Sequence, residues 1–296
     1  MQTRRLPAHE RAAIGCWATG RDRSWFAART PEEQDQALSA GERALVALLT
    51  ARREAGLPLA YLLGFREFFG QRFFVNPSVL IPRAETEQLL EAALEVVSEV
   101  VSEVVSEVSS AVASDPAAES RPALQVLDLG TGSGCLAIGL DVAARAKGWP
   151  VALTAVDQSF AALQTARNNA LWHGAHIQFL QGSWFEALGQ SDSRFDLVLS
   201  NPPYIAAQDP HLSQGDLPYE PASALVGSQP NADGLDDLRV IVGQAPRWLR
   251  PGGWLLVEHG HDQQPQVISL MQAAGFTKVV GQADLSGTPR LVKGQL

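Results

Sequence analysis

Residues 126–138 read Val-Leu-Asp-Leu-Gly-Thr-Gly-Ser-Gly-Cys-Leu-Ala-Ile. The stretch begins as an apolar strand, passes through a turn with glycine at every second position, and ends as the start of a helix. Gly130, Gly132 and Gly134 allow the backbone to approach a ligand closely. Cys135 occupies the place where a dinucleotide fingerprint has its third glycine. We therefore expect an adenosine-type ligand other than NAD at the carboxyl end of this strand.

The rest of the chain repeats the alternation of strand and helix. From residue 123 onward, helical stretches separate strands that we expect near 125–129, 151–156, 177–180, 195–200 and 254–259. This alternation predicts an α/β fold whose mostly parallel sheet is covered on both faces. The last segments, 277–280 and 290–293, are expected to form a closing hairpin. Residues 1–75 have a helical pattern that ends in a β-hairpin with glycine near its turn.

Two further residues fit a nucleoside site. Asp157 follows the strand after the glycine-rich turn, where an acidic group can accept both ribose hydroxyls. The alternative for Asp157 is capping of a helix that starts near Ser159. Trp184 comes just past a short strand, where an indole could flank an adenine ring or simply belong to the core.

The tetrapeptide Asn201-Pro-Pro-Tyr204 directly follows the apolar strand 195–200. An Asn side-chain oxygen and an adjacent backbone carbonyl can each accept one N–H of an NH2 group, which orients the nitrogen lone pair toward an electrophile. The ring of Tyr204 can stack on the planar group so presented. An ordinary turn would explain Asn-Pro-Pro alone. Together with the glycine-rich turn, however, the tetrapeptide predicts a methyl-transfer site.

The chain resembles the HemK/PrmC-type N5-glutamine methyltransferases, which modify peptide chain release factors. The resemblance extends from about residue 20 to the end, apart from one insertion. Its most specific part is the pair Ile-Pro-Arg-Ala-Glu-Thr-Glu at 81–87 and Asn-Pro-Pro-Tyr-Ile at 201–205. The other matching segments are 61–68, 79–80, 126–138, 208–212, 219–221, 224–226, 233–235, 251–260 and 284–290.

The resemblance implies a Rossmann-like class I methyltransferase domain with a seven-stranded sheet. We expect a helical substrate-docking domain at 1–75, a linker strand and helix start at 76–95, a low-complexity insertion at 96–122 and the S-adenosylmethionine-dependent domain at 123–296. The implied cofactor-binding residues are Gly130, Thr131, Gly132, Ser133, Gly134, Asp157, Trp184 and Asn201. The implied substrate-binding residues are Asn201, Pro202, Pro203 and Tyr204, of which Asn201, Pro202 and Tyr204 are the catalytic candidates.

The implied acceptor is the glutamine of the Gly-Gly-Gln loop in class 1 release factors. Two other enzyme activities use the same chemistry, namely methylation of a glutamine on a ribosomal protein and N6-methylation of adenine in nucleic acid. The segment 208–212 and the N-terminal pattern favour the release-factor branch. No segment resembles the basic, aromatic recognition domain that a duplex-DNA enzyme carries. A catalytically inactive adaptor is disfavoured by the intact motifs.

Composition and charge limit the possible partners. Seven acids between Glu91 and Glu119 account for most of the net charge of −9, and the remainder lacks the broad basic surface that would indicate nucleic acid. The two cysteines suggest neither a disulfide framework nor a zinc site, and the histidine pairs 173/176 and 259/261 lack partners for a metal. The residues after Met1 do not form a secretory signal, so we expect a cytoplasmic monomer without membrane attachment.

The insertion at 96–122 contains the repeat Val-Val-Ser-Glu, from Val96 to Glu107, followed by Ser, Ala and Pro. Glutamate at every fourth position excludes a membrane span. On a helix these glutamates form a like-charged stripe, which destabilises it slightly, and the β-branched valines add to that cost. We expect a helix that begins near Glu85 to continue for a few turns and then give way to a linker without catalytic duty.

Overall fold

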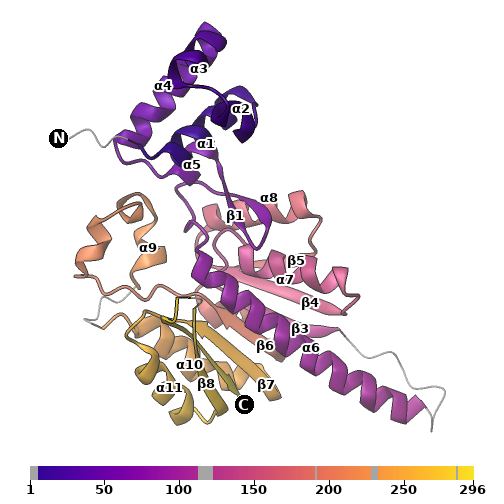
Figure 1. Cartoon of the computed structure of the whole chain (residues 1–296). Coiled ribbons are helices and arrows are strands. Elements are labelled where there is room, and N and C mark those ends of the chain that lie inside the picture. The colour runs from indigo at the N-terminus through magenta and orange to yellow at the C-terminus, as the bar shows by residue number, and fades with distance from the viewer. Residues whose placement is uncertain (1–5, 113–122, 191, 228–232, 285) are drawn as a thin grey trace.

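The centre of the molecule is one seven-stranded sheet with the order β5-β4-β3-β6-β7-β9-β8 (Figure 1). The computed structural model describes residues 6–112, 123–190, 192–227, 233–284 and 286–296, without the side chains of 103–112. The strands are β3 (Leu124–Leu129), β4 (Val151–Asp157), β5 (Ile177–Gln181), β6 (Phe195–Ser200), β7 (Leu249–Glu258), β8 (Thr277–Ala283) and β9 (Pro289–Gln295). The α/β prediction and the closing hairpin are both confirmed.

The order of the strands creates a switch point between β3 and β6. Both β4 and β6 pair with β3 in parallel, β7 is parallel to β6, and only β9 runs antiparallel to its neighbours β7 and β8. The chain therefore leaves β3 toward one side of the sheet and later returns to the other side. In such sheets the crevice outside the carboxyl ends of the two switch-point strands is where ligands bind. The glycine-rich turn and Asn201 follow these two strands.

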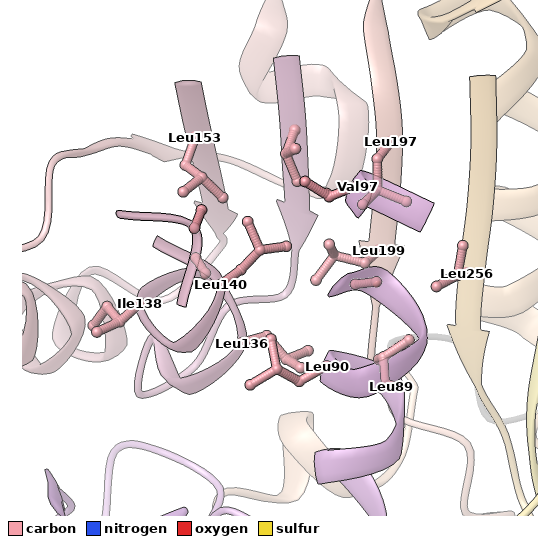
Figure 2. Packing of buried hydrophobic residues seen from close by; sticks show 14 of the residues in the cluster. Leu89, Leu90, Val97, Leu136, Ile138, Leu140, Leu153, Leu197, Leu199 and Leu256 are labelled. Atoms are coloured by element: carbon pink, nitrogen blue, oxygen red, sulfur yellow. The ribbon is translucent and has the colours of Figure 1, made fainter. Parts of the chain in front are cut away.

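Successive side chains of a strand point to opposite faces of the sheet, and here both sets are largely apolar. Helices therefore cover both faces. Leu197 and Leu199 of β6 pack in the core on one face, and Val198 packs in the core on the other. The first face is covered by α6 (Ala84–Val112) and α7 (Cys135–Ala146), and the second by α10 (Asp236–Trp248) and α11 (Gln264–Ala273). Figure 2 shows Leu89 and Leu90 of α6 beside Leu136 of α7.

The sequence predicts that this helix ends after a few turns. Helix α6 instead continues through the Val-Val-Ser-Glu repeat to Val112. Val96 and Val97 are buried against the sheet, and Val100 and Val101 pack at the edge of the same core. This burial offsets the helix cost of β-branched residues. Figure 1 shows the end of α6 reaching past the strands. Neither α6 nor any other described helix is long and apolar enough to cross a membrane. The expected linker at 113–122 lies outside the described residues.

The described residues 6–63 form five helices, of which the first, fourth and fifth pack around Leu6, Ile14, Leu49 and Leu62. They are α1 (Ala8–Thr19), α2 (Arg23–Ala27), α3 (Pro31–Ala37), α4 (Ala40–Glu54) and α5 (Leu59–Leu63). A hairpin of β1 (Phe65–Phe68) and β2 (Gln71–Phe74) follows, as predicted. The buried Asn169 of α8 (Phe160–His173) ties this hairpin to the glycine-rich turn, because its amide bonds both backbone groups of Phe74 and the carbonyl of Ser133.

Candidate functional site

The glycine-rich turn joins β3 to α7 through backbone conformations that favour glycine. Gly130, Gly132 and Gly134 have φ values of +71°, +54° and +82°. A Cβ at Gly134 would lie 2.8 Å from Ile138 Cδ1, so a side chain there would also displace the end of Ile138 on α7. The N–H groups of Gly130 and Thr131 both donate to the carbonyl of Val156, at 2.9 Å. The turn is therefore fixed to the end of β4.

The side chains between these glycines point into the protein. Thr131 Oγ1 donates to Asp128 Oδ2 at 2.6 Å, and both residues are buried. Burial raises the pKa of Asp128 to about 7. Ser133 is buried as well, and of the five predicted turn residues only Gly130 and Gly132 line the adjoining cleft. The turn therefore presents backbone to a ligand, while its side chains stabilise the turn from below.

Asp157 ends β4 and faces the same cleft. Its Oδ2 accepts the N–H of Gly132 at 2.9 Å, and its Oδ1 accepts the N–H of Ser159 at 2.8 Å. Burial raises the pKa of Asp157, and these two backbone donors oppose that shift. The capping alternative is wrong, because Ser159 itself caps α8 with its hydroxyl. Asp157 thus retains lone pairs on both oxygens for hydroxyl groups of a ligand.

Trp184 begins η1 (Trp184–Leu188) after β5, and its indole lies against the glycine-rich turn. A Cβ built on Gly130 would lie 3.2 Å from the ring. Trp184 Nε1 donates to Asp237 Oδ1 at 3.1 Å, across 53 residues of sequence. Burial raises the pKa of Asp237, which also lines the cleft. Sequence reasoning missed Asp237, since in the sequence it is one of two acids in the first turn of α10, where acids are common.

The cleft formed by these residues, which we call the glycine cleft, holds about 780 Å³ of open space. Its walls combine glycine backbone, the carboxyl groups of Asp157 and Asp237, and the Trp184 ring. Asn201 and Pro203 also line it. This mixture of an aromatic face, hydroxyl acceptors and open backbone suits a nucleoside.

Asn201 begins the segment after β6, and a chain of buried side chains holds it. Asn201 Nδ2 donates to Thr86 Oγ1 at 2.9 Å, and the Thr86 hydroxyl donates to Glu258 Oε2 at 2.7 Å. Tyr204 OH donates to the other carboxylate oxygen, Oε1, at 3.0 Å. Burial raises the pKa of Glu258 to about 7 and also raises the pKa of Tyr204. In the sequence, Thr86 lies in the segment 81–87 that carries the resemblance but has no role of its own, and Glu258 is expected to be structural or to line the edge of the site.

A second cleft, which we call the asparagine cleft, holds about 1460 Å³ on the other side of Asn201. Pro202 and Tyr204 line it, together with the charged residues Arg83, Glu85, Asp209, Asp233, Asp262 and Arg290. Asn201, Leu80 and Ala224 line both clefts. Asn201 therefore stands on the boundary between the two spaces, and a planar group entering the asparagine cleft would meet a ligand of the glycine cleft there.

Residues 217–225 form a roof that contributes to both clefts and includes η3 (Leu217–Tyr219) and α9 (Ala222–Leu225). The buried carboxylate of Glu220 pairs with Arg83 and accepts the N–H of Ile81 at 3.0 Å. Tyr219 OH donates to the carbonyl of Ala55 at 2.8 Å. The roof is thus attached both to the start of α6 and to the helices that precede the sheet.

No group of three or more His, Cys, Asp or Glu residues within the described ranges is arranged to hold a metal. Of the histidines considered in the sequence, His173 Nε2 donates to the carbonyl of Arg72 at 2.9 Å. His259 is buried, and its Nδ1 donates to the carbonyl of Gly260 at 2.8 Å. Both contacts are with the backbone.

The chain is similar to known proteins over nearly its whole length. Residues 120–285 match a family model described as "Methyltransferase domain". A protein of Bordetella pertussis named release factor glutamine methyltransferase is 42% identical over 292 residues, which are 98% of this chain and 96% of that protein. A protein of the same name from Xylella fastidiosa is 40% identical over 295 residues, 99% and 94% of the two chains.

Among solved structures, a T. thermophilus 16S rRNA N2 methyltransferase in complex with AdoMet and guanosine matches with a TM-score of 0.51. It is 19% identical, and the match covers 78% of this chain and 49% of that one. At this identity the likeness concerns the fold alone. The sheet described above is therefore shared with an rRNA methyltransferase.

Proposed function

Because the chain belongs to the family of release factor glutamine methyltransferases, we propose that it transfers a methyl group from S-adenosylmethionine to a glutamine side-chain nitrogen in class 1 peptide chain release factors. The observation that carries the proposal is the place of Asn201, which lines the glycine cleft and the asparagine cleft at once. A side chain in that place can hold an acceptor amide against a donor bound next door.

The glycine cleft has the groups that the methyl donor needs. Bound there, S-adenosylmethionine would supply a methyl group on a positively charged sulfur. Asp157 has lone pairs available for ribose hydroxyls, Trp184 offers an aromatic face for adenine, and the backbone at Gly130 and Gly132 allows close approach. These residues bind and orient the donor and undergo no chemical change themselves.

The asparagine cleft has the groups that the acceptor needs. Asn201 Oδ1 and the Pro202 carbonyl would each accept one N–H of the glutamine amide, and Tyr204 would pack on its plane. This clamp turns the nitrogen lone pair toward the glycine cleft. Orientation of this kind supplies a large share of rate enhancement without a covalent intermediate.

We also propose that the helices within residues 1–75 dock the protein partner. The support is their direct attachment to the roof of the site. Arg53 of α4 pairs with Glu10 of α1 and with Asp216 beside η3, both at 2.9 Å, and Tyr219 bonds Ala55. A partner gripping these helices would therefore be held close to the asparagine cleft.

The proposal is tested with purified protein and methyl-labelled S-adenosylmethionine. Four acceptors are compared, namely a class 1 release factor, the same factor with its Gly-Gly-Gln glutamine changed to alanine, ribosomal protein from the large subunit, and duplex DNA. We expect label only on the unaltered release factor, and fragmentation mass spectrometry should place it on that glutamine. Label on ribosomal protein or DNA instead, or label that survives the glutamine change, would overturn the proposal.

A further inference from the structure

The side chain at 201 is held by two residues that touch neither cleft surface. Thr86 lies in the first turn of α6 and Glu258 is the last residue of β7, and their exposed fractions are 2% and 1%. Neither is among the residues that line the glycine cleft or the asparagine cleft. Any effect they have on an acceptor must therefore pass through Asn201 or Tyr204.

The direction of the hydrogen bonds follows from the chemistry of the groups. Glu258 is ionised at a pH above its raised pKa of about 7. An ionised carboxylate only accepts hydrogen bonds, and a hydroxyl has one hydrogen to donate. Glu258 takes the hydrogen of Thr86 on one oxygen and that of Tyr204 on the other. The Thr86 oxygen is then left with lone pairs alone, so its neighbour on Asn201 has to be the NH2 end. The carbonyl oxygen of Asn201 is directed the other way.

We propose that Thr86 and Glu258 are positioning residues that keep the carbonyl oxygen of Asn201, and not its NH2 group, turned toward the acceptor amide. This inference rests on the proposed function, in which that oxygen accepts an N–H. A reversed Asn201 would present N–H to N–H, which loses the hydrogen bond and the orientation of the nucleophile with it. The Asn201 amide can adopt two orientations of nearly the same shape, which exchange its oxygen and its NH2 group. Thr86 and Glu258 thus select one of them.

Because both positioning residues are buried, the test uses a pair of substitutions that differ in the hydroxyl. Thr86→Val keeps the shape and removes the hydroxyl, whereas Thr86→Ser keeps the hydroxyl. We expect Thr86→Val to lower kcat by roughly 30-fold to 100-fold, since orientation is lost. The KM for the donor should change by less than about threefold. Thr86→Ser should restore kcat to within about threefold of the original protein, because the hydroxyl is present again.

Thr165 provides a matched control. It is also a buried threonine whose hydroxyl accepts an Asn NH2 group, that of Asn76 at 2.9 Å, and it lines neither cleft. Thr165→Val should lower the melting temperature about as much as Thr86→Val and leave kcat unchanged. A second check is Thr86→Val in an Asn201→Ala background, where it should add almost nothing to the loss.

A readout without catalysis separates this inference from the proposed function. The side-chain NH2 protons of Asn201, assigned by NMR through Asn201→Ala, should exchange with solvent roughly tenfold faster in Thr86→Val than in the original protein or Thr86→Ser. Equal exchange in all three, or equal kcat in the Val and Ser variants, would overturn the positioning role. Failure of every acceptor to be methylated by the unaltered protein would overturn the proposed function, with the exchange result still deciding the orientation.

Discussion

The glycine cleft and the asparagine cleft follow neighbouring strands, β3 and β6, yet they are built in different ways. The glycine cleft depends on backbone, held by local contacts such as the bond from Gly132 to Asp157, 25 residues away. The asparagine cleft depends on side chains, joined by bonds that span 115 residues from Asn201 to Thr86 and 172 residues from Thr86 to Glu258. We infer that substitutions which change φ should damage the first cleft, and substitutions which remove one polar atom should damage the second.

The largest effect should come from Asn201→Ala, which removes one acceptor of the clamp and leaves every backbone contact of the glycine cleft in place. We expect methyl transfer to fall roughly 1000-fold, in the range of other lost orienting or oxyanion contacts. Donor affinity, measured by calorimetry, should change less than about threefold. Equal loss of donor binding and transfer would mean that the two clefts are not separable in this way.

The next effect is a dependence of stability on pH. Each cleft has a fully buried carboxyl group close to it, namely Asp128 at the glycine-rich turn and Glu258 beside Thr86. Burial raises the pKa values of Asp128 and Glu258 to about 7, above their unfolded values of 3.8 and 4.5. The folded state therefore holds these protons up to higher pH than the unfolded state. The stability contribution of each group is complete below its unfolded pKa and is lost as the pH rises through about 7.

Denaturant unfolding between pH 5 and pH 8 should reveal this loss, on the order of a few kcal/mol for each group. Glu258→Gln and Asp128→Asn cannot ionise, so each should flatten the fall relative to the original protein. His259 is buried with a lowered pKa and acts in the opposite direction, but it is common to all three proteins. Parallel profiles for the three proteins would contradict the raised pKa values.

The local elements could be predicted from the sequence because their signals lie within a few residues. Strand, turn and helix between Val126 and Ile138 follow from apolar runs and glycine spacing, and Asn201 follows from one tetrapeptide. Thr86 and Glu258 could not be found that way. Their contacts form only when α6 and β7 meet beside β6. The sequence around a buried threonine or glutamate does not indicate which distant residue it will bond.

The length of α6 was underestimated for a related physical reason. Its valines and its glutamate stripe both lower intrinsic helix stability. As far as Val101, what outweighs this is burial of Val96 and Val97 on the sheet and packing of Val100 and Val101 against the same core, which are tertiary contacts. Likewise, the Thr131 side chain is held by Asp128 and the Ser133 carbonyl is held by Asn169, and the spacing of the glycines reveals neither contact.

A smaller effect should come from Gly132→Ala. A Cβ at Gly132 would meet no protein atom within 4 Å, so the costs are the positive φ and the intrusion of a methyl group into the glycine cleft. We expect donor affinity to fall about tenfold and stability to fall by about 1 kcal/mol. Gly174→Ala is the matched control, since Gly174 has a φ of +60° and equally open surroundings but lines neither cleft. It should lose stability alone.

The smallest effect should come from Tyr219→Phe, which removes only the bond from the roof to Ala55. Because this hydroxyl is exposed to water, we expect a loss of less than about 1 kcal/mol in stability. If the helices before the sheet dock the partner, KM for the release factor should rise slightly while donor affinity stays constant. A change in donor affinity instead would mean that the bond from Tyr219 to Ala55 affects binding in the glycine cleft.

The buried side of α6, which faces the sheet, has a consequence for the position of the Thr86 hydroxyl. Thr86, Leu90, Ala93 and Val97 lie at helical spacing on one side of α6, and all four are buried. One residue of slippage would rotate the helix by about 100° about its axis. The Thr86 hydroxyl would then leave its partners at the same moment as Val97 left the sheet. Packing far along the helix therefore sets the rotational phase of a hydroxyl at its beginning, and the positioning of Asn201 proposed above depends on that packing.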